Sequence, residues 1–282
     1  LKSDGYHMSL PTLYVVATPI GNLADLTPRA QQVLTGVDLV AAEDTRHTGK
    51  LLQHFNIKAN LISVHDHNER QRAGMIIDQL AAGKSVALVS DAGTPLISDP
   101  GFVLVRAVKE AGYTVSPIPG CCAFVAALSA SGMPSDRFSF IGFLPAKTGA
   151  RVKALEQLSD REETLVFYES THRIVDSLKD MQSVFGDQRR VGVAREITKT
   201  FETIHSAPVI ELIEWMLADT NQQRGEFVVM VEGAVKEEGS LNEETLRVLT
   251  LLAAELPPKK AAAITSEITG VGKKELYQQL IS

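Results

Sequence analysis

The sequence predicts an α/β fold, because two features recur along its first 120 residues. Short apolar runs alternate with helix-like segments of about 10–15 residues, and a polar cluster directly follows most of the runs. Strands that are apolar throughout and separated by helices are typical of a parallel sheet covered on both faces. We therefore expect such a sheet in the N-terminal part of the chain.

The expected strands of this sheet are short and apolar. They are residues 13–17, 38–42, 61–64, 86–89 and 114–118. The first helix opens at Thr27-Pro28, which combine an N-cap residue with a proline at the first helical position. The following helices are expected to end near Phe55 and to span about 69–82 and 102–111.

Polar clusters come immediately after four of these strands. They are Thr18–Asn22, Glu43–His47, His65–Glu69 and Ser90–Gly101. The carboxyl ends of parallel strands share one edge of a sheet, and ligands of open α/β sheets bind there. The four clusters therefore predict a ligand site at that edge.

The segment Ser90–Gly101 is the most unusual of the four. It holds two glycines, two prolines and two aspartates, and it exceeds the ~2–6 residues of an ordinary strand-to-helix loop. It contains neither of the glycine patterns that cradle phosphates. The pattern predicts a ligand loop, and the alternative is a tightly turned connection that binds nothing.

A junction at residues 117–120 precedes a helix of small residues at 121–131. This helix allows the close approach of a ligand or another backbone, or it is simply a tightly packed helix between domains. The next strands mix parallel-type and hairpin-type patterns, so a second domain with a mixed sheet is expected. They are residues 138–142, 164–168, 190–194, 200–205 and 226–231, with helices ending near 158 and 185 and another at 209–217.

The C-terminal segment contains only helical patterns. A polar linker at 236–240 leads to helices at 243–256, 258–269 and 273–280, the last two joined by Gly270-Val271-Gly272. Two helices joined by a short glycine-containing turn resemble a helix-turn-helix. From Leu256 onward there are four lysines and two glutamates. The segment is predicted to hold RNA, and a solvated capping bundle is the alternative.

Composition narrows the class of protein. The formal net charge of −6 over 282 residues argues against a surface covered in nucleic-acid-binding charge, although not against a local basic patch. No apolar run reaches the ~18 residues of a membrane span, and no signal-peptide pattern occurs, so a cytoplasmic protein without membrane contact is expected. Residues 1–11 are expected to be a tag or disordered leader.

No metal site is predicted. Cys121 and Cys122 are adjacent and have no second cysteine pair, and His65 with His67 lacks a third ligand. A serine hydrolase is weakly supported, because there is no GxSxG turn. Basic residues near strand ends suit phosphate or RNA-backbone contact, and the carboxylates beside them suit proton chemistry. The basic ones are Arg46, Arg173, Arg195 and Lys199, and the acidic ones are Glu43, Asp44, Asp66 and Glu196.

Five motifs in order carry a resemblance that covers about residues 13–233. They are the segments 17–23, 42–48, 90–101, 167–173 and 194–199. Together they resemble the tetrapyrrole-methylase superfamily, and within it the branch that methylates small-subunit ribosomal RNA. Gly93-Thr94-Pro95 stands where porphyrin and corrin methylases have Gly-Asp-Pro, which favours the RNA branch.

The resemblance implies two α/β domains, residues 12–120 and 121–235, with a cofactor cleft between them, and a C-terminal helical domain at 241–282. It implies a homodimer that transfers a methyl group from S-adenosylmethionine to a cytidine ribose 2′-hydroxyl in 16S rRNA or the 30S subunit. The implied cofactor contacts are Pro19, Ile20, Gly93, Thr94, Ile97, Cys122, Ala123, Tyr168, Ala194, Glu226 and Phe227.

The base that activates the hydroxyl is expected at a strand end. The candidates are Asp44 supported by Arg46 and Glu196 supported by Lys199. Substrate contacts are expected at His65, His67 and Arg173, while Asp91 and Asp99 are expected to shape their loop. Two other functions stay open: methylation of a porphyrinoid, and a non-enzymatic cofactor-binding factor in ribosome assembly.

Overall fold

The computed structural model describes residues 11–235, 241 and 243–281, and the chain forms two compact units, residues 1–233 and 234–282. The predicted leader, apart from Pro11, and the predicted linker 236–240 lie outside the described residues. In the described part of the chain, every helix is too short or too polar to cross a bilayer.

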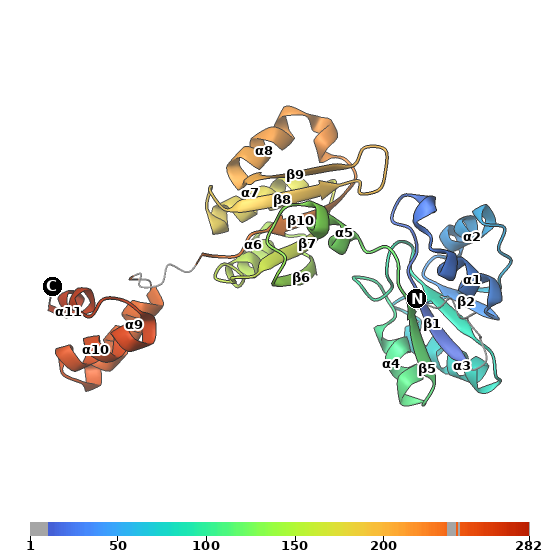
Figure 1. Cartoon of the computed structure of the whole chain (residues 1–282), viewed down its shortest axis with the longest axis horizontal. Helices are drawn as coiled ribbons and strands as arrows, with labels where there is room; N and C mark the ends of the chain where they lie inside the picture. The colour runs from blue at the N-terminus through green and yellow to red at the C-terminus, as the bar shows by residue number, and fades with distance from the viewer. Residues whose placement is uncertain (1–10, 236–240, 242, 282) are drawn as a thin grey trace, which may run out of the picture. The chain divides into compact units, whose positions relative to one another are not determined.

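The first sheet is parallel throughout, as predicted, with the strand order β3-β2-β4-β1-β5 (Figure 1). Its strands are β1 (Thr12–Val16), β2 (Leu39–Ala42), β3 (Leu61–Ser63), β4 (Val86–Val89) and β5 (Thr114–Ile118). The helices between them are α1 (Pro28–Gly36), α2 (Thr45–His54), α3 (Glu69–Ala81) and α4 (Phe102–Glu110), with a 3-10 turn η1 (Leu23–Asp25) after β1.

Alternating strand residues bury the two faces of this sheet. Val40 and Ala42 pack in a cluster with α1 and α2, whereas Ala41 between them packs with α3 and α4. Successive strand side chains point to opposite faces, so an apolar run covers both. The predicted helix start is also confirmed, because the Thr27 hydroxyl accepts a hydrogen bond from the backbone N–H of Ala30 at 3.1 Å.

The second sheet is mixed, with the order β6-β7-β10-β8-β9. Only the β6–β7 pair is parallel, and the other three pairs are antiparallel. The strands are β6 (Phe138–Phe143), β7 (Thr164–Ser170), β8 (Arg190–Arg195), β9 (Thr203–Pro208) and β10 (Glu226–Val231). The helices are α5 (Ala123–Ala130), α6 (Thr148–Glu156), α7 (Ile174–Phe185) and α8 (Val209–Ala218), with a 3-10 turn η2 (Thr220–Gln223).

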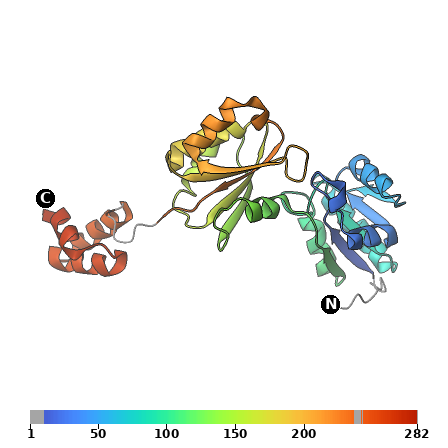
Figure 2. The same ribbon diagram turned by 45° about the horizontal axis from the view of Figure 1, so that its top comes forward.

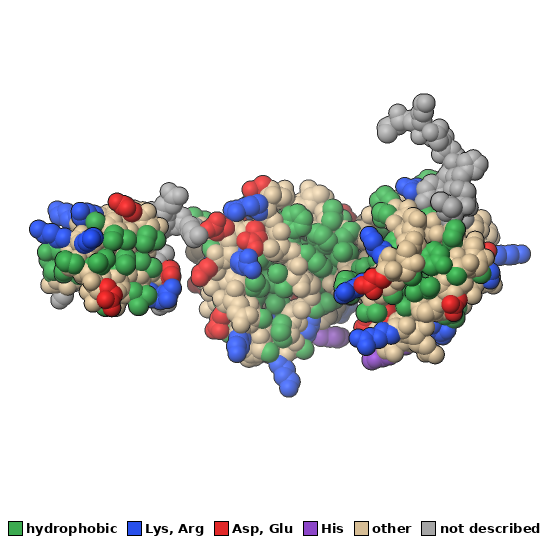
Figure 3. Space-filling model, turned by 90° about the horizontal axis from the view of Figure 1, so that it is seen from below, with side chains coloured by type: hydrophobic (Ala, Val, Ile, Leu, Met, Phe, Trp, Pro, Cys, Tyr) green, Lys and Arg blue, Asp and Glu red, His purple; other side chains and the backbone are tan. Residues whose placement is uncertain are grey.

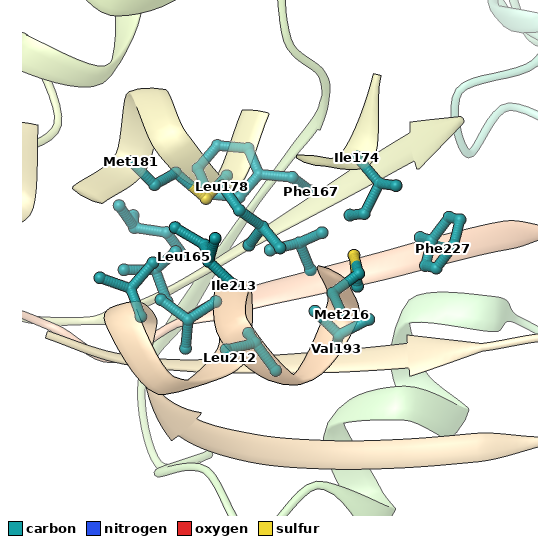
Figure 4. Close-up of a cluster of buried hydrophobic side chains, with 14 of the residues drawn as sticks. Leu165, Phe167, Ile174, Leu178, Met181, Val193, Leu212, Ile213, Met216 and Phe227 are labelled. Atoms are coloured by element: carbon teal, nitrogen blue, oxygen red, sulfur yellow. The ribbon is translucent and has the colours of Figure 1, made fainter. Parts of the chain in front are cut away.

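Helices α6, α7 and α8 cover one face of this sheet and α5 covers the other. The first face holds the larger core, in which Phe167 of β7 and Val193 of β8 pack among Leu178 of α7 and Leu212 of α8 (Figure 4). On the opposite face the small residues of α5 pack on β7, β8 and β10. The predicted small-residue helix therefore packs closely on the second sheet.

One predicted strand begins too early. The sequence places it at 200–205, whereas β9 starts at Thr203. Glu196 and Thr198 adopt left-handed backbone angles, with φ of 51° and 67°, and residues 196–202 form a turn between β8 and β9. Pairing resumes only where Arg195 lies opposite Thr203. Period-two patterns do not reveal such a turn, because its residues have strand-like composition.

The C-terminal unit consists of three helices that lie side by side in both ribbon views (Figures 1 and 2). They are α9 (Glu243–Glu255), α10 (Pro258–Thr269) and α11 (Lys273–Ile281). Leu249, Ala262, Val271 and Leu276 form its small core. All three helices were predicted within two residues of their observed ends.

Candidate functional site

The polar clusters predicted from sequence do share one edge of the first sheet, because they follow the parallel strands β1, β2, β3 and β4. Two of them are linked directly: the Asp91 carboxylate accepts a hydrogen bond from the backbone N–H of Asp44 at 3.0 Å. This contact agrees with the expectation that Asp91 shapes its loop. It also joins the β2–α2 and β4–α4 loops into one surface.

The loop 90–101 is held in a strained conformation. Leu96 and Ser98 have φ of 73° and 64°, which side-chain-bearing residues rarely adopt. Two backbone hydrogen bonds of 2.8 and 3.1 Å tie Gly93 to Thr18, and the Thr94 hydroxyl donates to the carbonyl of Cys121 at 2.9 Å. Strained residues persist where the surroundings over-determine them, often at binding sites.

A cavity of about 430 Å³ adjoins this loop. That volume is typical of a small-molecule site. Its walls come from the loops after β1 and β4, the start of α5, the β7–α7 loop and the strand β10. The lining residues are Ile20, Ala92, Gly93, Thr94, Ile97, Ser98, Asp99, Cys122, Ala123, Phe143, Tyr168, Glu169, Ser170, Thr171, His172, Ile197, Gly225, Glu226, Phe227 and Val228.

Most of the predicted cofactor contacts line this cavity. They are Ile20, Gly93, Thr94, Ile97, Cys122, Ala123, Tyr168, Glu226 and Phe227. The other two, Pro19 and Ala194, are not among its lining residues. Ala194 is fully buried in the cluster between α5 and the sheet, so its methyl group packs against protein. Predicted contacts that are far apart in the sequence, from Ile20 to Phe227, therefore line the same cavity.

Glu169 anchors the wall that follows β7. Its Oε1 lies 2.7 Å from Nη2 of Arg173 and also accepts from the backbone N–H of Ser170, while its Oε2 accepts from the Ser177 hydroxyl. The guanidinium also donates to the carbonyl of Leu144 at 3.2 Å. Arg173, a predicted substrate contact, is therefore engaged in an internal ion pair and does not line the cavity.

Thr171 closes the same wall onto the turn before β10. Its hydroxyl donates to the carbonyl of Gly225 at 2.6 Å and accepts from the N–H of Gly225 at 2.9 Å. One side chain thereby satisfies both backbone groups of a residue 54 positions away. The β7–α7 loop and the start of β10 therefore form one continuous surface of the cavity.

The predicted base Asp44 and its partner Arg46 lie outside the cavity wall. The Asp44 side chain caps α2 by accepting from the N–H of Arg46, and it holds the Arg46 guanidinium at 2.8 Å. The hydrogen bonds from Arg46 keep the pKa of Asp44 well below its usual range. A carboxylate of such low basicity fits the role of proton acceptor poorly.

The second predicted base, Glu196, is also engaged elsewhere. Burial raises its pKa, but hydrogen bonds from Lys199 and from the backbone of Glu226 outweigh this and leave the pKa of Glu196 below its ordinary value. Lys199 lies 2.9 Å from Glu196 and 2.7 Å from Glu226. Its stem packs on Gly21, where an added Cβ would lie 2.5 Å from it. Glu196 and Lys199 thus connect β8 and β10 to the loop that follows β1.

The histidines after β3 lie close to each other and to the side chains of their own loop. The rings of His65 and His67 are 6.0 Å apart, and His65 contacts the Asn68 side chain at 3.1 Å. Over the described ranges, no group of three or more His, Cys, Asp or Glu side chains is placed to hold a metal ion. The roles of His65 and His67 as substrate contacts stay predictions.

Asp99, which was expected to shape its loop, also lines the cavity. Thr171 and His172 also line it, and both lie inside a motif that the sequence singles out. Only the choice of residues within that motif was missed. Ile197 likewise lies inside a singled-out motif, 194–199. Phe143 had no sequence signal, because nothing in an apolar pattern distinguishes a cavity wall from a core.

Burial alters the titration of several cavity groups. It raises the pKa of Cys122 and, with the neighbouring Cys122 thiol, that of Tyr168, so both keep their protons at neutral pH. Burial also raises the pKa of Asp99, although a hydrogen bond with Ser90 lowers it and the charge of Asp91 raises it further. The net shift of Asp99 is upward.

Residues 12–213 match the family model described as tetrapyrrole (corrin/porphyrin) methylases, which spans well over half of the chain. The chain belongs to the tetrapyrrole methylase family. A solved structure shares the fold: uroporphyrin-III C-methyltransferase from Thermus thermophilus superposes with a TM-score of 0.56 at 20% identity, covering 78% of this chain and 94% of that one. A second model, described as the RsmI C-terminal HTH domain, matches residues 239–282.

Other proteins are far more similar to this chain in sequence than that solved structure is. A Pseudomonas aeruginosa protein named ribosomal RNA small subunit methyltransferase I is 58% identical over 276 residues, covering 97% of this chain and 98% of its own. Proteins of the same name from Escherichia coli O157:H7 and Vibrio cholerae are 58% and 55% identical. They cover 94% and 95% of this chain and 93% of their own lengths.

Proposed function

We propose that this chain is an S-adenosylmethionine-dependent methyltransferase that modifies a cytidine ribose 2′-hydroxyl in small-subunit ribosomal RNA. The observation that carries the proposal is the similarity to ribosomal RNA small subunit methyltransferase I proteins, which extends almost from end to end and through both compact units. The solved porphyrinoid methyltransferase cited above matches only 78% of the chain at 20% identity, and that likeness concerns the fold.

The chemistry of the cavity supports the choice of methyl donor. Asp99, Glu169 and Glu226 line it, whereas no Lys or Arg of the described residues does. Such a lining disfavours a phosphate-bearing ligand and favours a cationic one, since opposite charges attract more strongly away from bulk water. S-adenosylmethionine carries a positive sulfonium and no phosphate, and when bound it supplies an activated methyl group.

Individual residues of the chain have distinct parts in this proposal. The apolar side chains of Ile20, Ile97 and Phe227 exclude water around the donor, and the hydroxyl of Thr94 is fixed by its bond to Cys121. The rigid wall formed by Thr171 and Gly225 would orient the ligands. Positioning of two reactants in line supplies a large part of the rate enhancement in reactions of this kind.

The C-terminal helices are proposed to bind the RNA. Lys259 and Lys260 begin α10, Lys273 and Lys274 begin α11, and all four side chains are exposed. Figure 3 shows Lys and Arg side chains projecting from this unit. Lysines that neutralise phosphates release counterions, which makes the affinity for RNA sensitive to salt.

Replacing these four lysines by glutamine is expected to weaken binding of small-subunit rRNA at least ~10-fold at 0.1 M salt and to flatten its salt dependence. Filter binding at several salt concentrations measures both. The control is Lys84→Gln with Lys109→Gln. Both lysines are exposed; Lys84 lies just before β4 and Lys109 at the end of α4, so both are near the amino-terminal ends of strands of the first sheet. Equal rRNA affinities for the two variants would contradict an RNA-binding role, and S-adenosylmethionine affinity should be unchanged in both.

The proposal includes a homodimer, as the family resemblance implies, and a location in the cytoplasm. It also retains His65, His67 and Arg46 as contacts for the RNA backbone near the carboxyl edge of the first sheet. Arg46 lies in the first turn of α2, which follows β2, and His65 and His67 lie in the loop after β3. Sedimentation of the purified chain would test the dimer.

The proposed function is tested by offering the protein methyl-labelled S-adenosylmethionine together with 30S subunits, free 16S rRNA or a precorrin. Label is expected in the RNA of at least one ribosomal substrate and not in the precorrin. Transfer to the macrocycle alone would indicate a porphyrinoid methyltransferase. Binding of the donor without any transfer would indicate a non-enzymatic binding protein.

A further inference from the structure

Phe143 differs from the other large apolar side chains of the cavity wall because its ring is exposed. It ends β6, the edge strand of the second sheet, and its side chain is 56% exposed although it lines the cavity. Phe227 on the same wall is only 2% exposed. A single exposed apolar side chain is common and is no evidence of function by itself. The backbone beneath Phe143 supplies that evidence.

A β-bulge places the Phe143 side chain on the cavity face of the sheet. Phe140 of β6 pairs with Val166 of β7, and the register then shifts by one residue. Phe143 consequently pairs with Tyr168, which also lines the cavity. Without the shift Phe143 would pair with Glu169, whose side chain bonds to α7 on the opposite face. Bulges re-aim side chains in this way and are common beside active sites.

Gly142 allows the bulge and keeps it against the loop 90–101. Its φ is 78°, in the region that side-chain-bearing residues rarely adopt. An added Cβ at Gly142 would lie 3.1 Å from Oγ of Ser98, which lines the cavity. The end of β6 therefore lies against the loop that is proposed to bind the methyl donor.

A row of aromatic rings supports Phe143 from the protein side. Its ring centroid lies 5.6 Å from that of Tyr168, at an interplanar angle of 62°. Tyr168 contacts Phe140 in the same edge-to-face manner at 4.9 Å, and Phe140 stacks on Phe124 of α5 at 4.5 Å. Aromatic pairs attract each other in these arrangements. Phe143 is thus the exposed end of a row that begins in the cluster between α5 and the sheet.

The chemistry of a ribose acceptor determines what can cover this ring. The 2′-oxygen and the base are attached to adjacent carbons of the ribose, so the base reaches the mouth of the cavity together with the hydroxyl. None of the described Lys or Arg side chains lines the cavity, so phosphate has no cationic partner there. Proteins bind unpaired RNA bases by stacking them on aromatic side chains.

The adenine of S-adenosylmethionine is also flat and needs apolar cover. Ile20, Ile97 and Phe227 offer it surface that is less exposed than Phe143. A donor shielded from water therefore lies among these three side chains, and the exposed ring is left for the acceptor.

We propose that Phe143 stacks on the base of the nucleotide whose ribose is methylated, a positioning role that rests on the proposed function. The stack fixes the attached ribose so that its 2′-hydroxyl meets the methyl group of the donor. Stacking tolerates every base, because each has a π face. Phe143 therefore positions the nucleotide and does not select cytidine.

The test measures single-turnover methylation of 30S subunits by three variants at Phe143. At limiting subunit concentration, Phe143→Ala is expected to lower the rate at least ~10-fold, because one base stack is lost. Phe143→Leu keeps apolar bulk without a π face and should lower the rate at least ~5-fold, whereas Phe143→Trp should stay within about threefold. A leucine variant as fast as the parent chain would overturn the proposal.

Phe138→Ala is the matched control. Phe138 lies on the same strand and is 44% exposed, but it does not line the cavity. Its rate should stay within about threefold of the parent chain, and a loss equal to that of Phe143→Ala would contradict the stack.

Two binding measurements separate the other possible occupants of the ring. Isothermal titration should give all variants dissociation constants for S-adenosylmethionine within about threefold of the parent chain. A loss of donor affinity in Phe143→Ala as large as its loss of rate would mean that the ring covers adenine. A sedimentation coefficient changed only in the Phe143 variants would mean that it covers a second copy of the chain. Either result would overturn the proposal.

Ultraviolet cross-linking gives a readout that needs no turnover. The protein is irradiated with 30S subunits and S-adenosylhomocysteine, digested with nuclease and protease, and analysed by peptide mass spectrometry. A nucleotide should be attached at Phe143 and not at Phe138, and a missing adduct at Phe143 would overturn the stack. If the parent chain forms this adduct but transfers no methyl group to RNA, the proposed function fails and the stack stands.

Discussion

Glu169→Ala is expected to lower the thermal unfolding midpoint by roughly 6–20 °C, because it leaves a charged group unpaired inside the protein. The Glu169 side chain is only 2% exposed and that of Arg173 23%. Removing one partner of such a pair costs ~3–5 kcal/mol of stability. The Ser177 hydroxyl and the Ser170 N–H lose their acceptor as well. Differential scanning fluorimetry measures the shift.

The chain contains a matched control for this variant. Arg106 and Glu110 form an ion pair with the same four-residue spacing, but both side chains are about two-thirds exposed. Exposed pairs contribute at most about 1 kcal/mol, so Glu110→Ala should shift the midpoint by no more than about 4 °C. Equal shifts in the two variants would contradict the buried anchor.

A double replacement separates the charge from the packing. Glu169→Leu with Arg173→Met removes both members of the pair and fills the space with apolar atoms. Such replacements cost much less than a single deletion, so the double variant should be more stable than Glu169→Ala. If the double variant is less stable, the lost hydrogen bonds matter more than the unpaired charge.

Gly93→Ala is expected to raise the dissociation constant for S-adenosylmethionine at least ~10-fold, equivalent to about 1.4 kcal/mol. Gly93 has a φ of 83°, and an added Cβ would lie 3.3 Å from Cγ2 of Ile20, which also lines the cavity. A left-handed backbone alone costs a side-chain-bearing residue ~1–2 kcal/mol. The variant therefore combines strain in the loop with displacement of a cavity residue.

Gly83→Ala isolates the strain. Gly83 has nearly the same φ, 80°, yet nothing lies within 4 Å of an added Cβ there, and its turn precedes β4, whereas the cavity loop 90–101 follows that strand. Both variants should lose about the same stability, and only Gly93→Ala should bind the donor less tightly. Calorimetric titration measures the affinity of both variants for S-adenosylmethionine. Equal affinities would mean that the loop 90–101 does not form the donor site.

The sequence predicted the first sheet well because its strands are apolar throughout, and that pattern demands cover on both faces. Residues 38–42 were expected as a strand, and Val40, Ala41 and Ala42 do bury alternate faces. The start of β9 was misplaced because left-handed residues at Glu196 and Thr198 leave no periodic signal. Local conformation, rather than hydrophobicity, decides such boundaries.

The candidate site was predicted less completely than the fold. The family resemblance, not the residue pattern, pointed to the cofactor contacts, and most of them line one cavity. Arg173 looked free for phosphate because its partner Glu169 lies four residues away on a strand end, where no helical spacing rule applies. That Asp99 lines the cavity was missed because sequence does not say which residues of a twelve-residue loop face inward.

The most direct test of the account is the chemical position of the transferred methyl group. RNA from 30S subunits treated with the protein and labelled S-adenosylmethionine can be digested to nucleosides and separated by chromatography with mass detection. The account predicts that the label elutes as 2′-O-methylcytidine. Label on a cytosine ring or on another nucleoside, or no label in RNA while a porphyrinoid is methylated, would contradict it.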